Sequence, residues 1–340
     1  MARRVILTAA SLALILLLAR MLLTVRRQVP IVVGFVTTYR FPLAPIALAD
    51  EDRALIASLG TPGKRFYEPG TAAIFDVSPA LASANADEML ATLAATLRRV
   101  KPGGPDGDMA IVHLTAIGTL DDKGRPCIVP PGTSADPAGL EEDSYLSVDR
   151  LLAGLRDALP ERIGILVVLD ACRPSTDWPL GVDDGAFPPA VEAHMAVSNL
   201  KRMWVMVPAS TGQNSYSSAA FGASGAVREF VRGMRGAADA RPWGDADGRV
   251  ELQELSAYLT LRVDQWARAM LGDRQTPILT STSSDRDADA ALAWTASQTP
   301  VVELRSDADV SEDAWLADRW RAAEQLRPSA IRERPLTWST

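Results

Sequence analysis

Short, uninterrupted apolar runs recur along this chain of 340 residues, and helix-like stretches separate them. The runs lie at 30–36, 71–77, 108–115, 163–169, 202–209 and 276–280. Runs of about 4–8 apolar residues are typical of strands that are buried on both faces. Because such strands alternate here with amphipathic helices, the pattern favours an α/β fold with a mostly parallel sheet flanked by helices on both faces.

The helix-like stretches share apolar residues at three- and four-residue spacing. Asn85–Val100 is the clearest example, and Pro102-Gly103 ends it. The expected helices lie at 50–59, 85–100, 151–159, 225–234 and 252–270. In a parallel sheet, functional residues collect at the carboxyl ends of the strands, so the residues that follow each apolar run are the first candidates for a site.

Composition narrows the class of protein. Apolar residues make up 47 % and charged residues 23 %, which indicates a globular chain. The formal net charge of -7 offers no basic field for nucleic acid, so we expect no nucleic-acid partner. The two cysteines, Cys127 and Cys172, do not form a disulfide scaffold and are compatible with a reducing compartment.

The N-terminus carries an apolar segment, Val5–Val25, with Arg3-Arg4 before it and Arg26-Arg27 after it. About 20 apolar residues span a bilayer as a helix. A cleaved signal peptide is the alternative, but the run is long for one, and arginines stand where small residues should mark the cleavage site. We therefore predict a single-pass membrane anchor. Arginines within and after the run slightly outweigh the earlier pair, which places the main domain in the cytoplasm.

The run that ends at residue 169 belongs to an unusual segment, "ILVVLDACRPS" (165–175). It resembles the nucleophile segment of the caspase and metacaspase superfamily, in which Gln-Ala-Cys-Arg-Gly follows a histidine by about 50 residues. Metacaspases and their bacterial relatives have Asp two residues before the cysteine, as Asp170 is here. The resemblance implies a caspase-fold, clan CD cysteine peptidase of bacterial type, with Cys172 at the nucleophile position. A buried structural cysteine is the alternative.

The resemblance extends from about residue 30 to 280. In these relatives a strand ending in Ser-Gly-His-Gly precedes an acidic turn and a short apolar strand, and "LTAIGTLDDKGRPCIVPP" (114–131) takes that place here. Three later segments follow in the family's order: "VPASTGQNSYSS" (207–218), "GDADGRVELQELSAYL" (244–259) and "RQTPIL" (274–279). The order of the segments is more specific than any one of them.

One position departs from the family pattern. Aligning "TAIG" on Ser-Gly-His-Gly places Ile117 at the histidine position, 55 residues before Cys172. Gly118 is retained, and the resemblance implies that its backbone N–H belongs to the oxyanion hole. Isoleucine can neither generate a thiolate from a thiol with a pKa near 8.5 nor protonate a departing amine. The sequence therefore predicts a degenerate motif that keeps the cysteine and lacks its base.

Two histidines remain as possible bases. His113 lies four residues before Ile117, inside the expected strand, and a core histidine is the favoured interpretation; it is the rescue candidate if the alignment is shifted. His194 lies after the nucleophile segment, where a surface helical position is favoured. Arg173 could favour a thiolate at Cys172.

Two acidic groups allow a structural and a functional interpretation. The resemblance implies that Asp170 accepts a basic substrate side chain, and a strand-end acid that caps backbone N–H groups is an equal alternative. Residues 243–254 partly match a calcium loop, with Asp245, Asp247 and Glu254 at ligand positions. Trp243 stands at the first ligand position, so a tight turn that leads into a helix is favoured over a metal site.

The chain divides into an anchor (1–28), a caspase-like domain (29–285) and an acidic, helix-like C-terminal extension (286–340). We expect no cofactor, and a protein or peptide as substrate or partner. Two functions compete. The first is a pseudopeptidase that acts as a binding or regulatory module; the second is an active caspase-like endopeptidase that uses Cys172 with a non-standard base. The missing histidine favours the first.

Overall fold

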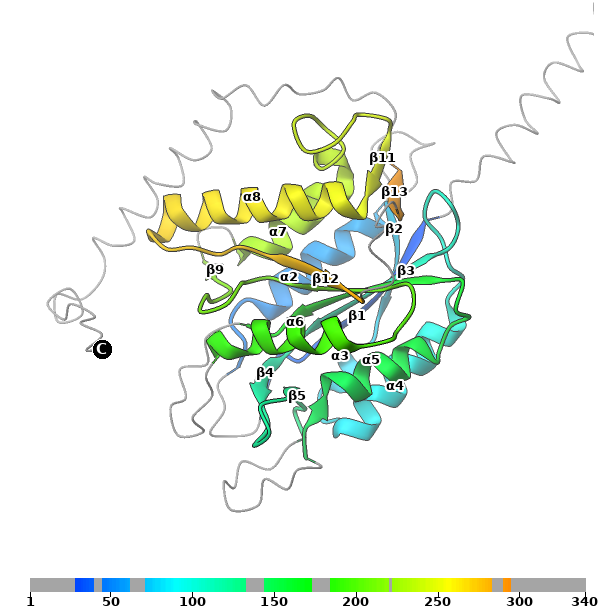
Figure 1. Ribbon diagram of the computed structural model, residues 1–340, viewed down its shortest axis with the longest axis vertical. Helices are drawn as coiled ribbons and strands as arrows, with labels where there is room; N and C mark the ends of the chain where they lie inside the picture. The colour runs from blue at the N-terminus through cyan, green and yellow to red at the C-terminus, as the bar shows by residue number, and fades with distance from the viewer. Residues whose placement is uncertain are drawn as a thin grey trace, which may run out of the picture.

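The computed structural model describes residues 28–39, 45–61, 71–132, 144–172, 184–219, 222–282 and 290–294. At its centre is a six-stranded sheet with the order β12-β8-β7-β3-β1-β2 (Figure 1). Its strands are β1 (Val29–Phe35), β2 (Ala72–Asp76), β3 (Met109–Thr115), β7 (Gly164–Asp170), β8 (Met203–Val207) and β12 (Ile278–Ser281). Five of them are parallel, and β12 runs antiparallel to β8. The prediction of a mostly parallel sheet is confirmed.

Helices cover both faces of this sheet (Figure 1). One face carries α2 (Ala49–Ala57), α7 (Gly225–Arg232) and α8 (Leu252–Leu271), and the other carries α3 (Ser78–Leu81), α4 (Ala86–Arg99), α5 (Val148–Arg156) and α6 (Phe187–Val197). We call these the α8 face and the α4 face. Every residue of β1, β3 and β7 is buried because each strand packs against helices on both sides. Successive side chains enter separate apolar clusters, one on each face.

Helix boundaries follow local signals in the sequence. Asn85 and Glu88 form a reciprocal capping box that begins α4. Glu251 and Glu254 do the same for α8, which ends at Gly272 with a left-handed φ of 67°. Single helical turns follow α2 at Ser58–Gly60 and precede α6 at Asp184–Ala186, and a π-helical turn at Gly233–Ala237 follows α7.

Three small antiparallel sheets surround the central one. They join β4 (Ile117–Leu120), β5 (Pro126–Val129) and β6 (Leu146–Ser147), then β9 (Ser217–Ser218) and β10 (Ala223–Ser224), and finally β11 (Arg249–Glu251) and β13 (Ala291–Trp294). The pairing of β13 with β11 bears on the C-terminal domain boundary, which the sequence predicted at residue 285. Because β13 pairs with β11 and Leu292 is completely buried, the folded domain reaches at least Trp294.

The predicted anchor lies outside the described residues, apart from Gln28, and so does most of the 286–340 extension. Among the described residues, no helix is both long enough and apolar enough to cross a membrane.

Candidate active site at the carboxyl end of the sheet

Cys172 lies two residues beyond the end of β7, at the carboxyl edge of the sheet. It is fully buried and belongs to the apolar cluster of the α4 face. Its carbonyl oxygen accepts a hydrogen bond from the Ser215 N–H at 2.9 Å. The strand-end position matches the sequence prediction, but in this conformation the thiol is closed to solvent. Arg173 lies outside the described residues.

The segment that contains Ile117 runs directly beside the cysteine segment. The Ala116 N–H donates to the Asp170 carbonyl at 3.2 Å, and the Gly118 N–H donates to the Ala171 carbonyl at 3.1 Å. A Cβ atom at residue 118 would lie only 2.5 Å from that Ala171 oxygen. Glycine therefore allows the two segments to touch, and its amide, the expected oxyanion donor, is already used by the chain itself.

Ile117 is 5 % exposed, and its side chain packs in the cluster of the α8 face, whereas Cys172 packs in that of the α4 face. The Ile117 N–H donates to the Tyr39 hydroxyl oxygen at 2.7 Å. Burial raises the pKa of Tyr39 despite the opposing effect of this amide, so the phenol stays neutral at ordinary pH. Tyr39 also packs against both apolar clusters.

His113 is a core residue on the α8 face. It is 1 % exposed, stacks on Phe35 with ring centroids 5.4 Å apart, and meets the edge of Phe230 at 5.9 Å. In the sheet it is in register with Val168, four residues before Cys172. At about 3.3 Å per residue, this places it about 13 Å back along the strand, beyond the reach of a general base. These contacts agree with the favoured interpretation as a core histidine.

His194 lies on α6, and its Nε2 atom is 3.7 Å from a carboxylate oxygen of Asp149 on α5. The contact joins two helices of the α4 face rather than the strand ends. The structure therefore brings neither histidine to the cysteine.

Asp170 is 1 % exposed and sits among hydroxyl groups. The Thr115 and Ser215 hydroxyls each donate to one of its oxygens at 3.5 Å. Gln275, which is fully buried, donates to the Ser215 hydroxyl at 3.3 Å and to the Pro208 carbonyl at 3.0 Å. Ser215 and Gln275 come from 207–218 and 274–279, so two segments singled out by the resemblance meet at Asp170.

A small cavity adjoins Asp170 on the α8 face. Its volume is about 20 Å³, and His113, Met206, Phe230 and Pro277 help to line it. That volume holds about one water molecule and cannot accept a lysine or arginine side chain. The described residues therefore leave no room for a basic side chain beside Asp170 in this conformation.

Sequence reasoning missed Tyr39, Thr115, Ser215 and Gln275 as parts of this edge. Thr115 carried a local signal, since it follows His113 by two residues and so faces the same side of β3. Tyr39 carried none, because its contact with Ile117 spans 78 residues of sequence.

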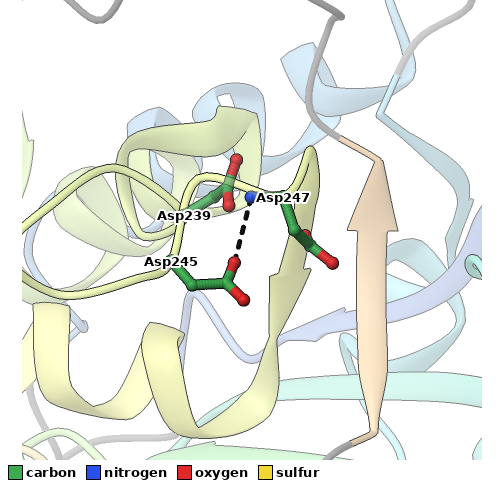
Figure 2. A group of neighbouring side chains, drawn as sticks. All are labelled: Asp239, Asp245 and Asp247. Carbon is green, nitrogen blue, oxygen red and sulfur yellow. Dashed lines mark hydrogen bonds between the residues drawn. The ribbon is translucent and has the colours of Figure 1, made fainter.

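The acidic loop before α8 brings Asp239, Asp245 and Asp247 together, with carboxylate oxygens within 4.8 Å of one another (Figure 2). Asp239 was not expected in this group. Glu254 is engaged elsewhere: one oxygen accepts the Asp245 N–H, and the other accepts the Glu251 N–H in the helix cap.

Loop amides also use the two predicted aspartates. An Asp245 oxygen accepts the Asp247 N–H at 3.0 Å (Figure 2). An Asp247 oxygen accepts the Arg249 N–H at 2.8 Å. These bonds are those of a tight turn that leads into a helix, which is the interpretation favoured from the sequence.

No family model matches this sequence, and no curated protein is significantly similar to it. The solved structures similar to it include caspases. Caspase-1 from Spodoptera frugiperda has a TM-score of 0.46 and 12 % identity, over 80 % of this chain and 92 % of that one. The Drosophila initiator caspase Dronc has a TM-score of 0.44 and 11 % identity, over 75 % and 80 %. The pro form of the Spodoptera enzyme gives 0.44 and 11 %, over 76 % and 93 %.

These structures belong to the family that the motifs around Cys172 resemble.

Proposed function

We propose that this chain is a caspase-like domain that has lost its catalytic base and acts as a binding or regulatory module for a protein or peptide partner. The observation that carries the proposal is Ile117. It occupies the expected histidine position and packs on the opposite face of the sheet from Cys172. A thiol with an ordinary pKa is only a few per cent ionised at neutral pH, and amide cleavage also needs a proton for the departing amine.

The surroundings of Cys172 support the same proposal. The thiol is buried, and the Gly118 N–H that an oxyanion would need is bonded to the Ala171 carbonyl. The neighbouring Ile117 N–H is bonded to Tyr39. A substrate carbonyl would have to displace the chain's own acceptors before it could be polarised.

An active endopeptidase with a non-standard base is the second candidate. The observation in its favour is the contact between the Gly118 and Ala171 backbones, which keeps the two expected catalytic segments side by side. In that case the edge must open and Asp170 must accept a basic side chain of the substrate. A base from outside the described residues would complete the site.

A peptidase assay separates the two candidates. The full chain is incubated with a library of quenched fluorescent peptides, in parallel with Cys172→Ala and Ile117→His. We expect wild type and Cys172→Ala to give the same background signal. Turnover by wild type that Cys172→Ala abolishes would establish the endopeptidase and remove the pseudopeptidase proposal.

We also propose that Val5–Val25 anchors the chain in a membrane as a single span, with the domain in the cytoplasm. The length of the apolar run and the arginines around it support this. The full chain should remain in the membrane pellet after a carbonate wash, and the double change Leu14→Arg and Leu17→Arg should release it. Protease added outside intact cells should leave the domain uncut. Cleavage by that protease would show that the domain lies on the outer side of the membrane.

A further inference from the structure

All strands of the central sheet except β12 begin at one edge, which we call the amino edge. Met109 of β3 is in register with Gly164 of β7, and Ile165 with Met203 of β8. The residues just before these strands bond to one another: the Gly164 N–H donates to the Asp108 carbonyl at 2.8 Å, and the Ile165 N–H donates to the Arg202 carbonyl at 2.9 Å. The segments 98–108, 157–163 and 197–202 therefore form one continuous surface.

The chain enters this surface directly from the apolar N-terminal segment. Only Arg26, Arg27 and Gln28 separate Val25 from the first residue of β1. The loop after α4 lies against this entry point, since a Cβ atom on Gly103 would be 1.9 Å from the Gln28 carbonyl oxygen. If residues 5–25 span a membrane, three residues of extended chain, about 10 Å, allow the amino edge to reach the headgroups.

The amino edge carries cations without counter-ions. Arg98, Arg99, Lys101 and Arg162 are all exposed, and none makes a side-chain ion pair or hydrogen bond within the described part of the chain. This local excess is opposite in sign to the chain's net charge of -7. Two further cations at this edge are neutralised, because Lys201 pairs with Glu161 and Arg202 pairs with Asp108.

An exposed apolar residue and an unpaired acid also lie at the amino edge. Val197, at the end of α6, is 79 % exposed, the highest exposure of any large apolar side chain in the described residues. Asp157 is an exposed acid that makes no ion pair within the described residues, so the unpaired charge of the edge stays positive. Unpaired cations beside an exposed apolar residue suit the interface between lipid headgroups and acyl chains.

We propose that the amino edge docks on anionic phospholipid headgroups of the membrane that holds the N-terminal segment. The inference rests on the proposed anchor and adds to it a lipid preference and an orientation. The strands are seven residues long, so Cys172 and Ile117 lie about 20 Å from the lipid, at the opposite edge. The candidate partner site then faces the soluble compartment, which makes its partner a soluble protein or peptide.

The test measures how closely the amino edge approaches lipid in nanodiscs. The full chain with Asp157→Cys is labelled with a fluorophore; the native cysteines are 3 % and 0 % exposed and do not compete for the label. Discs contain phosphatidylcholine, alone or with phosphatidylglycerol, and a small share of headgroup-spin-labelled lipid as quencher. Docking predicts at least about twofold stronger quenching in the anionic discs, with the difference abolished by high salt.

Two variants of equal charge show whether the edge itself is responsible. Changing Arg98, Arg99, Lys101 and Arg162 to Gln should abolish the lipid dependence. Changing Lys123, Arg125, Arg268 and Arg274 to Gln, at the far end of the molecule, should preserve it. The salt and lipid arms keep all four unpaired cations of the edge and lack only the Asp157 carboxylate, so they stand even if a variant unfolds. Equal quenching in both kinds of disc would overturn the proposal.

If residues 5–25 do not span the membrane, the nanodisc experiment gives a different result. A chain that does not enter discs has no membrane span, and the same labelled protein is then mixed with phosphatidylglycerol vesicles. Binding that the amino-edge variant weakens by about tenfold supports the docking surface on its own. Absence of binding removes it.

Discussion

At the residue scale, Gly118 shows how the segment of Ile117 packs closely against the segment of Cys172. A methyl group there would meet the Ala171 oxygen at 2.5 Å and the Phe187 ring at 2.9 Å. Gly118→Ala should therefore destabilise the fold by about 1–3 kcal/mol in urea unfolding and make Cys172 react faster with iodoacetamide. Gly124→Ala is the contrast: its position is sterically open but has a φ of +73°, so it should cost about 1 kcal/mol and leave the thiol unchanged. Equal thiol rates in the two variants would contradict this account.

Arg156 is a second residue whose surroundings decide its effect. It is 8 % exposed, and its guanidinium donates to five carbonyl groups, on Leu159, Pro160, Ile163, Lys201 and Arg202. It thereby ties the end of α5 to the starts of β7 and β8. Arg156→Met should cost about 2–4 kcal/mol because buried carbonyls lose their donors. Arg150→Met, on the same helix but with an exposed ion pair to Asp87, should cost less than about 1 kcal/mol. Similar losses in thermal or urea unfolding would show that burial is not the cause.

At the scale of elements, the sequence predicted what local pattern determines. The runs behind β1, β3, β7 and β8 are apolar at most of their buried positions, with His113, Thr115 and Asp170 as polar exceptions, so their strands were found within a residue or two. The short strands β4, β6, β11 and β13 depend on distant partners and carry too few residues for a periodic signal. The antiparallel direction of β12 was equally hidden, because an apolar run is the same in either direction.

The segment after α8 offers an element-scale prediction about pH. Asp264 of α8 accepts hydrogen bonds from Arg268 at 2.8 Å and Arg274 at 3.1 Å, so it fixes the turn that leads to β12. Burial raises the pKa of Asp264, but these bonds outweigh it and hold the pKa below its ordinary value. A carboxylate whose pKa is lowered by folding stabilises the folded state at pH values above its unfolded-state pKa. This stabilisation is lost as the pH falls through the lowered pKa of the folded state. Asp264→Asn should therefore cost about 1 kcal/mol at pH 7 and progressively less below pH 4, as followed by urea unfolding. A constant difference down to pH 3 would refute this assignment.

At the scale of the whole molecule, the two edges of the sheet have different characters. The carboxyl edge is closed by contacts that join residues far apart in sequence, such as Tyr39 with Ile117 and Gln275 with Ser215. The amino edge carries the exposed cations Arg98, Arg99, Lys101 and Arg162, which have no ion-pair partner among the described residues. Motifs predicted the nucleophile position at Cys172 and the histidine position at Ile117, since such predictions depend on residue identity. The closure of the site depends on tertiary contacts, which no local pattern encodes.

The C-terminal boundary of the folded domain is a property of the whole molecule, and it lies later in the chain than the sequence predicted. Leu292 of β13 is fully buried in the cluster of the α8 face, although it follows the expected boundary. Leu292→Ala should lower the free energy of unfolding by about 2–5 kcal/mol, as for other buried leucines. Leu261→Ala, on the 44 % exposed position of α8, is the matched control and should change it by less than about 0.5 kcal/mol. Were the two losses equal, β13 would be a peripheral strand and the domain would end before it. A selective loss at Leu292 instead means that β13, through its pairing with β11, is part of the folded domain.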